Sequence, residues 1–248
     1  MLKERFKRAR AEIIGEAVST EGVGGLNERS IHKILKLSIE PNTDFHEVKF
    51  LGSVADIKNE EGIFEVQTKG AYKLKGKLIK YLEHCPVTLV IPIIREKYLR
   101  YIDTETGEIL PPKRSPRPEN IYHALNSIFS LADLFLFDNF KLMLVFLSAD
   151  EYKHRVKKKG QRRVDAIPRE ILEVREITAR EEFLEFFPKS LPEEFVASEF
   201  SRAIKKPSRF TYFVIKFYEN LGFIENVGKR GRAILYKRVG CAKIQKDK

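Results

Sequence analysis

Cysteine is scarce in this sequence, with only Cys85 and Cys241 among 248 residues. Neither has a Cys or His neighbour at the spacing of a zinc site, and the side chains of the adjacent pair His84 and Cys85 would diverge on a helix. We therefore expect no zinc centre.

Long apolar runs are also absent. No stretch reaches the length that a bilayer-spanning helix requires, and Asp133 interrupts the apolar segment 131–137. The N-terminal MLKERFKRAR is charged and has no apolar run behind it, so it does not resemble a signal peptide. The glycine-rich residues 19–25 lack the Gly-Lys-Ser/Thr ending of a phosphate-binding loop. We expect a cytoplasmic protein with no membrane partner.

Positive charge is what the chain has in excess, with a formal net charge of +11. Residues 201–248 contain thirteen Lys or Arg against three Asp or Glu, and residues 153–163 contain seven bases and no acid. Clustered Lys and Arg side chains displace the counterions condensed on a polyphosphate. The two clusters favour nucleic acid as the partner over a merely solubilising surface.

Hydrophobic periodicity predicts an alternation of helices and strands. The expected helices cover residues 2–18, 28–39, 71–84, 121–136, 191–204 and 209–221. The expected strands and hairpins cover residues 46–53, 54–69, 87–94, 98–110, 141–148 and 222–237. Residues 153–163 are expected to form a loop or an exposed arm.

The hairpin over residues 54–69 carries the candidate site. Asp56 precedes its tight Asn-Glu-Glu-Gly turn, and Glu65, Gln67 and Lys69 follow the turn at a spacing of two. Because side chains alternate along a strand, these three are expected on one face. A carboxylate on one strand and Glu-x-Gln on its neighbour can surround one hard cation with oxygen ligands. The alternative is a surface hairpin with a polar face.

This order of helix, three strands, helix and strand, with Asp56 on the second strand and Glu65-x-Gln67 on the third, resembles the PD-(D/E)XK nuclease superfamily. The resemblance implies an α/β (α+β) fold, with a restriction-endonuclease-like mixed sheet flanked by helices. It also implies Mg²⁺ (or Mn²⁺) as the cofactor and two acidic ligands, Asp56 and Glu65. Glu28 matches the helical Glu found in some branches of the superfamily, as a third metal ligand.

The sequence departs from this family at Gln67, which stands where the family usually has Lys, and at Ala55, where the motif name has Pro. Gln67 can orient a water molecule but cannot act as a base or bring positive charge. Lys69 is expected on the same face, and Lys73 and Lys77 on the following helix can also reach in. Either a substitute Lys completes a catalytic set of Asp56, Glu65, Gln67 and Lys69, or the domain binds without cutting.

The C-terminal residues combine a helix, the turn 205–207, a second helix and a basic hairpin, and they resemble the winged helix-turn-helix domain. Three side chains of the second helix are then free to meet base edges or phosphates: Arg209, Tyr212 and Lys216. Three at the tip of the hairpin suit phosphate contact: Lys229, Arg230 and Arg232.

Together these resemblances imply an N-terminal helix and loop over residues 1–25, a nuclease-like domain over 26–163 and a winged-helix domain over 164–248. We expect a Mg²⁺-dependent DNA endonuclease. The alternative is a DNA-binding regulator or accessory protein with a degenerate nuclease-like domain. A homodimer would serve an enzyme that cuts both strands of a duplex. In a third interpretation both domains bind proteins, and Phe183, Phe186 and Phe187 form a docking surface, although such aromatic residues more often belong to the core.

Overall fold

The structure is a computed structural model, and it describes the chain except residues 22–29, 104–106, 157–159 and 240–248. The α-helices are α1 (Leu2–Glu21), α2 (Ser30–Ile39), α3 (Lys75–Leu82), α4 (Ile121–Ile128), α5 (Ala197–Ile204) and α6 (Ser208–Asn220). The 3-10 helices are η2 (Thr43–Phe45), η3 (Ala71–Leu74), η4 (Phe129–Leu136) and η5 (Arg180–Phe186). The strands of the main sheet are β1 (His46–Phe50), β2 (Ser53–Asn59), β3 (Gly62–Val66), β4 (Val87–Asp103), β5 (Lys113–Arg114), β6 (Phe140–Val156) and β7 (Gly160–Ile177).

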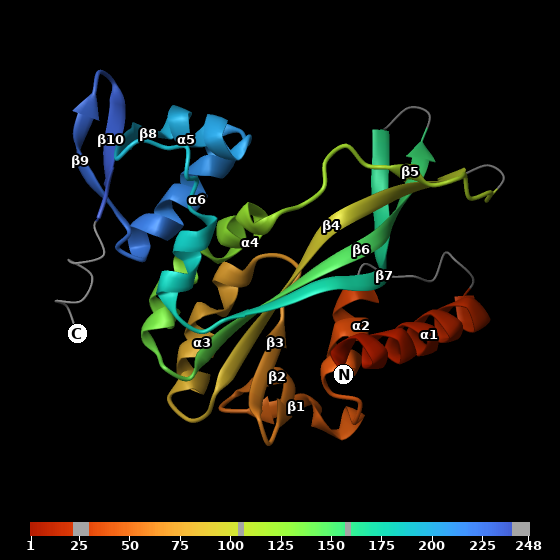
Figure 1. The fold of residues 1–248 in the computed structure, drawn as a ribbon. Helices are drawn as coiled ribbons and strands as arrows, with labels where there is room; N and C mark the ends of the chain where they lie inside the picture. Colours follow the sequence, from red (N-terminus) through yellow and green to blue (C-terminus); the bar gives the residue numbers. More distant parts are fainter. Residues whose placement is uncertain (22–29, 104–106, 157–159, 240–248) are drawn as a thin grey trace.

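The main sheet is mixed and has helices on both faces, which gives an α/β architecture (Figure 1). Its strand order is β1-β2-β3-β4-β6-β7, with β5 paired to β4. β3, β4 and β6 run parallel, and the connections between them carry α3 and α4. One face packs on α3, α4 and η4, while the other packs on α1 and α2. The expected mixed sheet flanked by helices is therefore confirmed.

Helix α1 belongs to this architecture. Phe6 and Ala9 are buried in the same apolar cluster as Ile34 of α2 and Val66 of β3. The expected N-terminal segment therefore supplies part of the core that covers one face of the sheet. Glu28, at the expected start of α2, lies outside the described residues.

Three strands of the sheet are much longer than their apolar runs predict. β4 and β6 have 17 residues each and β7 has 18. The expectation of a loop or exposed arm at 153–163 is wrong for the residues described, because β6 and β7 continue through it with His154 opposite Arg162. β7 also crosses the expected domain boundary at 163/164 and pairs with β6 as far as Ile177.

Buried ion pairs explain why hydrophobic periodicity misses the outer half of this sheet. Asp150 of β6 is buried and accepts two hydrogen bonds of 2.9 Å from the Arg169 guanidinium. The Nε of Arg100 on β4 lies 2.9 Å from the same carboxylate. Asp150 is thus a charged residue that faces inward and is satisfied by its partners, and a search for apolar periodicity does not detect such a position.

After β7 the chain forms a second unit with its own sheet, in the strand order β8-β10-β9. β8 (Glu194–Val196) leads into α5, and β9 (Ile224–Arg230) and β10 (Ala233–Arg238) form a hairpin after α6. The helix expected from residue 191 begins only at Ala197. The Val196 backbone N–H donates to the Glu199 carboxylate over 2.8 Å, which caps α5 at that point.

Aromatic side chains join the two units. The Phe183 ring packs edge-on against Phe135 of η4 and Phe217 of α6, with ring centroids 4.8 Å apart in both pairs. Phe183 and Phe187 are buried, and Phe186 is partly buried against the same core. The interpretation of Phe183 and Phe187 as core residues is therefore confirmed, and the alternative of a docking surface is wrong for them.

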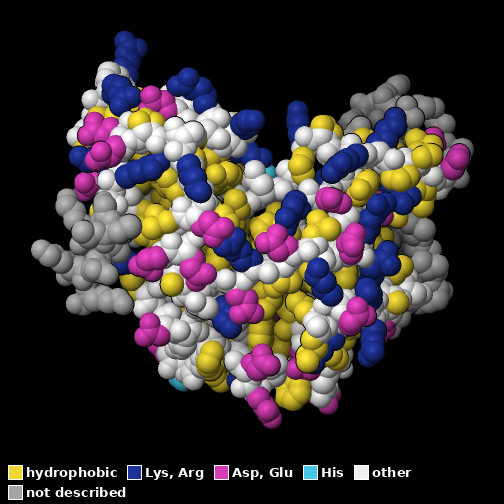
Figure 2. Space-filling model, in the orientation of Figure 1, with side chains coloured by type: hydrophobic (Ala, Val, Ile, Leu, Met, Phe, Trp, Pro, Cys, Tyr) yellow, Lys and Arg dark blue, Asp and Glu magenta, His cyan; other side chains and the backbone are white. Residues whose placement is uncertain are grey.

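In Figure 2 a hollow separates the second unit from the outer part of β4, β6 and β7, and Lys and Arg side chains gather along both of its sides. Within the described ranges, no helix combines the length and apolar character needed to cross a membrane.

Candidate functional site

The two expected acidic residues lie where β2 and β3 stop pairing. These strands are paired from Asn59 opposite Gly62 to Ile57 opposite Phe64, and the next residues outward are Asp56 and Glu65. The turn is held from the neighbouring strand, because the Ile63 N–H donates to the Pro86 carbonyl over 2.9 Å. A Cβ on Gly62 would lie 2.4 Å from that carbonyl oxygen, so only glycine fits there.

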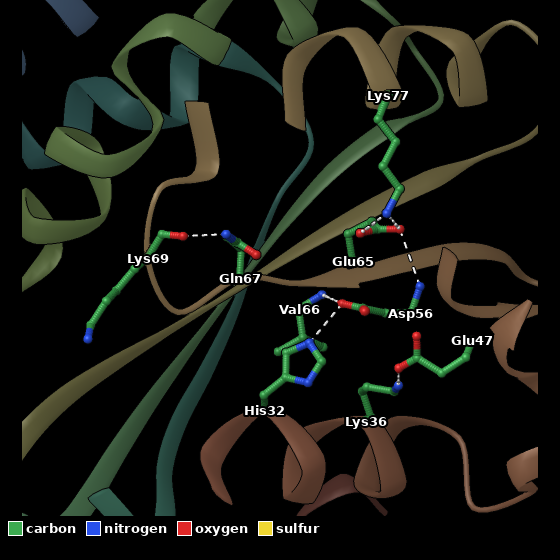
Figure 3. A network of polar contacts seen from close by, with 9 residues as sticks. All are labelled: His32, Lys36, Glu47, Asp56, Glu65, Val66, Gln67, Lys69 and Lys77. Atoms are coloured by element: carbon green, nitrogen blue, oxygen red, sulfur yellow. Dashed lines mark hydrogen bonds and ion pairs between the residues drawn. The ribbon is translucent and has the colours of Figure 1, made fainter. Parts of the chain in front are cut away.

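Asp56 is held from the side of α2. Its Oδ2 accepts a hydrogen bond of 2.8 Å from the Val66 backbone N–H and lies 3.0 Å from the His32 Nε2 (Figure 3). Burial alone would raise the pKa of this carboxyl. The His32 hydrogen bond and charge, together with the Val66 N–H, outweigh burial and lower the pKa of Asp56 below its ordinary value.

Glu65 is held from the opposite face, by α3. Only 2% of this residue is exposed, and both of its carboxylate oxygens lie 2.7 Å from the Lys77 Nζ (Figure 3). The Asp56 backbone N–H donates to the Glu65 Oε1 over 3.3 Å. Burial raises the pKa of Glu65, the negative charge of Asp56 adds to this, and Lys77 opposes it without cancelling it.

Gln67 and Lys69 do not join the two carboxylates. β3 ends at Val66, so strand alternation does not extend to either residue. The Gln67 side-chain amide donates to the Lys69 carbonyl, and the Lys69 side chain points away from Asp56 and Glu65 (Figure 3). The structure brings Lys77 to Glu65 in place of the expected Lys69.

His32 was not among the expected site residues. The sequence signal for it is its place on α2, one position from the buried Ile31. A second pair lies beside the site, where Lys36 of α2 donates to Glu47 of β1 (Figure 3). α2 therefore faces the hairpin with two basic or titratable side chains.

Asp56 and Glu65 are the candidate metal ligands of this site. Among the described residues no group of three or more His, Cys, Asp and Glu side chains has the arrangement of a metal site. Asp56 and Glu65 are linked by the hydrogen bond from the Asp56 N–H. Mg²⁺ is usually held by one or two carboxylates and keeps several waters, so two adjacent carboxylates suit Mg²⁺ as a donor set.

The three expected DNA-contacting residues of α6 differ in their exposure to solvent and in their side-chain partners. Arg209 is exposed, and Tyr212 is 50% exposed. Lys216 is half-buried and donates to the Glu219 carboxylate over 2.6 Å, with its Nζ 6.0 Å from the centre of the Tyr212 ring. Arg209 and Tyr212 are thus presented to solvent, and Lys216 is held along the helix.

All three expected contacts of the hairpin of β9 and β10 are exposed, and one of them, Arg230, is also paired. Lys229 and Arg232 are exposed. The Arg230 guanidinium pairs with the Glu199 carboxylate over 3.1 Å and donates to the Glu194 carbonyl over 3.3 Å. Arg230 therefore fixes the hairpin to β8 and α5.

Comparison with known proteins gives a relative and a family. An uncharacterized protein of Treponema pallidum (strain Nichols) is 27% identical over 217 residues, which cover 85% of each chain. Such a share cannot fit within residues 1–179, so the similarity continues into the second unit. No solved structure matches the chain. A family model matches residues 29–179, from the start of α2 to just beyond β7, and the chain therefore belongs to the family described as a domain of unknown function, DUF8091.

Proposed function

We propose that this protein binds DNA and hydrolyses its phosphodiester bonds with Mg²⁺ held at Asp56 and Glu65. The observation that carries the proposal is the meeting of two carboxylates and one ammonium group where β2 and β3 diverge. This set has the composition that metal-assisted phosphodiester hydrolysis requires.

The order of the elements supports the same assignment. The strands β1, β2 and β3 pair in antiparallel order, and β3 then runs parallel to β4 and β6. Helices connect the parallel strands, as expected for a PD-(D/E)XK core. The second unit has the order β8-α5-α6-β9-β10 and the sheet order β8-β10-β9, which suits a winged helix-turn-helix. We infer both fold assignments from this connectivity.

The chemistry at the site is divided among three side chains. Bound Mg²⁺ would polarise the scissile phosphate and lower the pKa of a water molecule. Asp56 and Glu65 would hold the ion. Lys77 takes the place expected for a substitute lysine, and its ammonium supplies positive charge beside the carboxylates for the developing negative charge on phosphate. Gln67 orients neighbouring groups by hydrogen bonding only.

DNA would be held by α6 and by the hollow between the second unit and the outer part of β4, β6 and β7, along which Lys and Arg side chains gather. Arg209 and Tyr212 lie exposed on that helix, and Lys229 and Arg232 lie exposed on the hairpin beyond it. Charge at such positions gives an affinity that falls steeply with salt, because each neutralised phosphate releases counterions.

A second function is favoured because both carboxylates already have hydrogen-bond or ion-pair partners within the protein. The Asp56 Oδ2 already has two nitrogen partners, and the buried Glu65 has Lys77 on both oxygens. An ion would have to displace some of these groups. A protein whose carboxylates serve only the fold would bind DNA without cutting it.

Cleavage and binding assays on the same variants separate these functions. Wild type, Asp56→Asn, Glu65→Gln and Lys77→Met are incubated with a labelled duplex and a single strand in Mg²⁺ or Mn²⁺, and affinity is measured by fluorescence anisotropy in EDTA. We expect the three variants to bind like wild type and to lose cleavage. Lys75→Met serves as the control, because Lys75 lies on the same helix and pairs with Asp133 away from the site. Equal cleavage by wild type, Asp56→Asn and Glu65→Gln would refute the nuclease assignment.

A further inference from the structure

A pocket of about 370 Å³ lies between the segment that follows β3 and the helices α4, η4 and α6. Its volume falls within the range of small-molecule sites, roughly 300–1,000 Å³. Three aromatic rings and three short polar side chains contribute most of its wall. The lining residues are Thr68, Lys69, Gly70, Tyr72, Asn126, Ser127, Phe129 and Phe213.

One aromatic ring of this pocket, that of Tyr72, is unusually accessible. Tyr72 is 53% exposed although it is a large aromatic residue. Phe129 of η4 and Phe213 of α6 pack with their ring centroids 4.8 Å apart, and the half-exposed Tyr212 lies 5.5 Å beyond Phe213. An exposed aromatic face beside further rings is the arrangement on which unpaired nucleobases stack.

The pocket is held in shape by contacts between the two units. The Asn126 side-chain amide of α4 donates to the Phe210 carbonyl of α6 over 3.1 Å. The Asn220 side-chain amide, at the other end of α6, donates to the Phe129 carbonyl over 3.0 Å. The wall built by α4, η4 and α6 therefore does not depend on a ligand to form.

Positive charge accompanies the rings. Lys69 lines the pocket, and the Lys73 Nζ lies 6.0 Å from the centre of the Tyr72 ring. Gly70 turns the chain between these two lysines with a φ of 68°, a left-handed conformation that favours glycine. A nucleobase can stack on an aromatic ring while a nearby ammonium group pairs with its phosphate. Such a site selects a nucleotide over a neutral apolar ligand.

The segment of chain that leaves the carboxylate site forms part of the pocket wall. β3 ends at Val66, and the Gln67 N–H still donates to the Val90 carbonyl over 2.9 Å. Thr68 and Lys69 then enter the pocket wall. Figure 3 shows the Lys69 side chain directed away from Glu65, while its carbonyl is tied to Gln67.

We propose that this pocket receives an unpaired nucleobase, stacked on Tyr72, so that the protein selects DNA with single-stranded nucleotides over fully paired duplex. The inference rests on the proposed DNA-binding function. It names the substrate class of that function, namely single strands or duplexes with a single-stranded extension. Thr68 and Ser127 supply the hydroxyl groups that can meet the edge of the base.

Binding of three DNAs to the full chain tests the proposal. A blunt duplex, a duplex with a single-stranded overhang and a single strand are compared by fluorescence anisotropy at fixed low salt. We expect the overhang duplex to bind about tenfold tighter than the blunt duplex, and Tyr72→Ala to remove most of that difference. Tyr72→Phe keeps the ring and should keep the preference. Phe45→Ala, at a 37% exposed aromatic of η2, is the control and should change nothing.

A 2-aminopurine base in the overhang reports stacking directly, since its fluorescence falls when it stacks on a ring. We expect quenching by wild type and Tyr72→Phe and its loss in Tyr72→Ala. Equal affinity for all three DNAs, or equal losses in Tyr72→Ala and Phe45→Ala, would overturn the pocket while leaving DNA binding intact. Absence of binding to any DNA at low salt would overturn both proposals.

Discussion

Removal of the Lys77 ammonium should destabilise the protein in a pH-dependent way. Lys77 lies 2.7 Å from both oxygens of Glu65, whose side chain is 3% exposed. Lys77→Met keeps most of the apolar stem and deletes the charge. The substitution therefore leaves a buried carboxylate with the Asp56 N–H as its remaining protein donor among the contacts described above.

The size of the effect follows from burial on each side of the pair. Removing one partner of a fully buried ion pair typically costs about 3–5 kcal/mol. The Lys77 side chain is 21% exposed and the Asp56 N–H stays in place, so water and this donor reduce the loss. We expect a loss of about 2–3 kcal/mol in the free energy of unfolding at pH 7.5. For a chain of this length that lowers Tm by roughly 5–10 °C.

The pH dependence has a definite sign. Glu65 has a raised pKa in the folded state, so the folded protein binds its proton more tightly than the unfolded chain does. Stability therefore falls as the pH rises from the ordinary carboxyl value through the folded pKa. Lys77→Met raises that folded pKa further. The difference between wild type and variant should be largest above it and should shrink as Glu65 becomes protonated at low pH.

Chemical denaturation of wild type and Lys77→Met between pH 4.5 and 8 measures this difference. Lys75→Met is a matched control on the same helix, because Lys75 and Asp133 also lie 2.7 Å apart but are 41% and 49% exposed. An exposed pair contributes about 0–1 kcal/mol, and the control should show a correspondingly small loss. Equal losses in the two variants, or a Lys77→Met loss that does not change with pH, would refute the structural reasoning.

Three other substitutions test separate parts of the structure by denaturant unfolding. Gly62→Ala should cost at least about 2–3 kcal/mol, because its Cβ would lie 2.4 Å from the Pro86 oxygen, whereas Gly52→Ala meets no atom within 4 Å and should cost about 1 kcal/mol. Asp56→Asn should lose stability at pH 7, and the loss should narrow as the pH falls through the lowered folded pKa of Asp56, where wild type also loses its charge. Phe183→Ala should cost about 3–5 kcal/mol and should lower one common unfolding transition, since its ring joins both units.

Local sequence signals predicted the hairpin that carries the site. Its β-branched and aromatic residues form strands, and the two residues between Asn59 and Gly62 form the turn, as the sequence indicates. The apolar run at 87–94 is likewise a buried strand, the first half of β4. These features depend on neighbours in the sequence, which periodicity and turn chemistry describe well.

The sequence left several lysines as candidates for the basic partner of Glu65. Strand alternation favoured Lys69, but β3 ends at Val66 and Gly70 turns the chain with a φ of 68°. Lys77 reaches Glu65 because α3 packs across the sheet through Leu78, a tertiary contact that no local spacing reveals. The long outer strands were missed for a similar reason, since Asp150 is buried through partners on two other segments of the chain.

The two carboxylates are anchored from opposite faces of the sheet, and this matters for any chemistry at the site. His32 reaches Asp56 from α2, while Lys77 reaches Glu65 from α3. An ion between the carboxylates would compete with both groups, and the Lys77 ammonium would also repel it. Lys77 would therefore weaken metal binding while it stays on Glu65, although the same ammonium is the charge that a phosphate needs. The proposed nuclease and the alternative of a purely DNA-binding protein would differ in whether bound DNA draws Lys77 away from Glu65 toward a phosphate and so leaves that carboxylate to the ion.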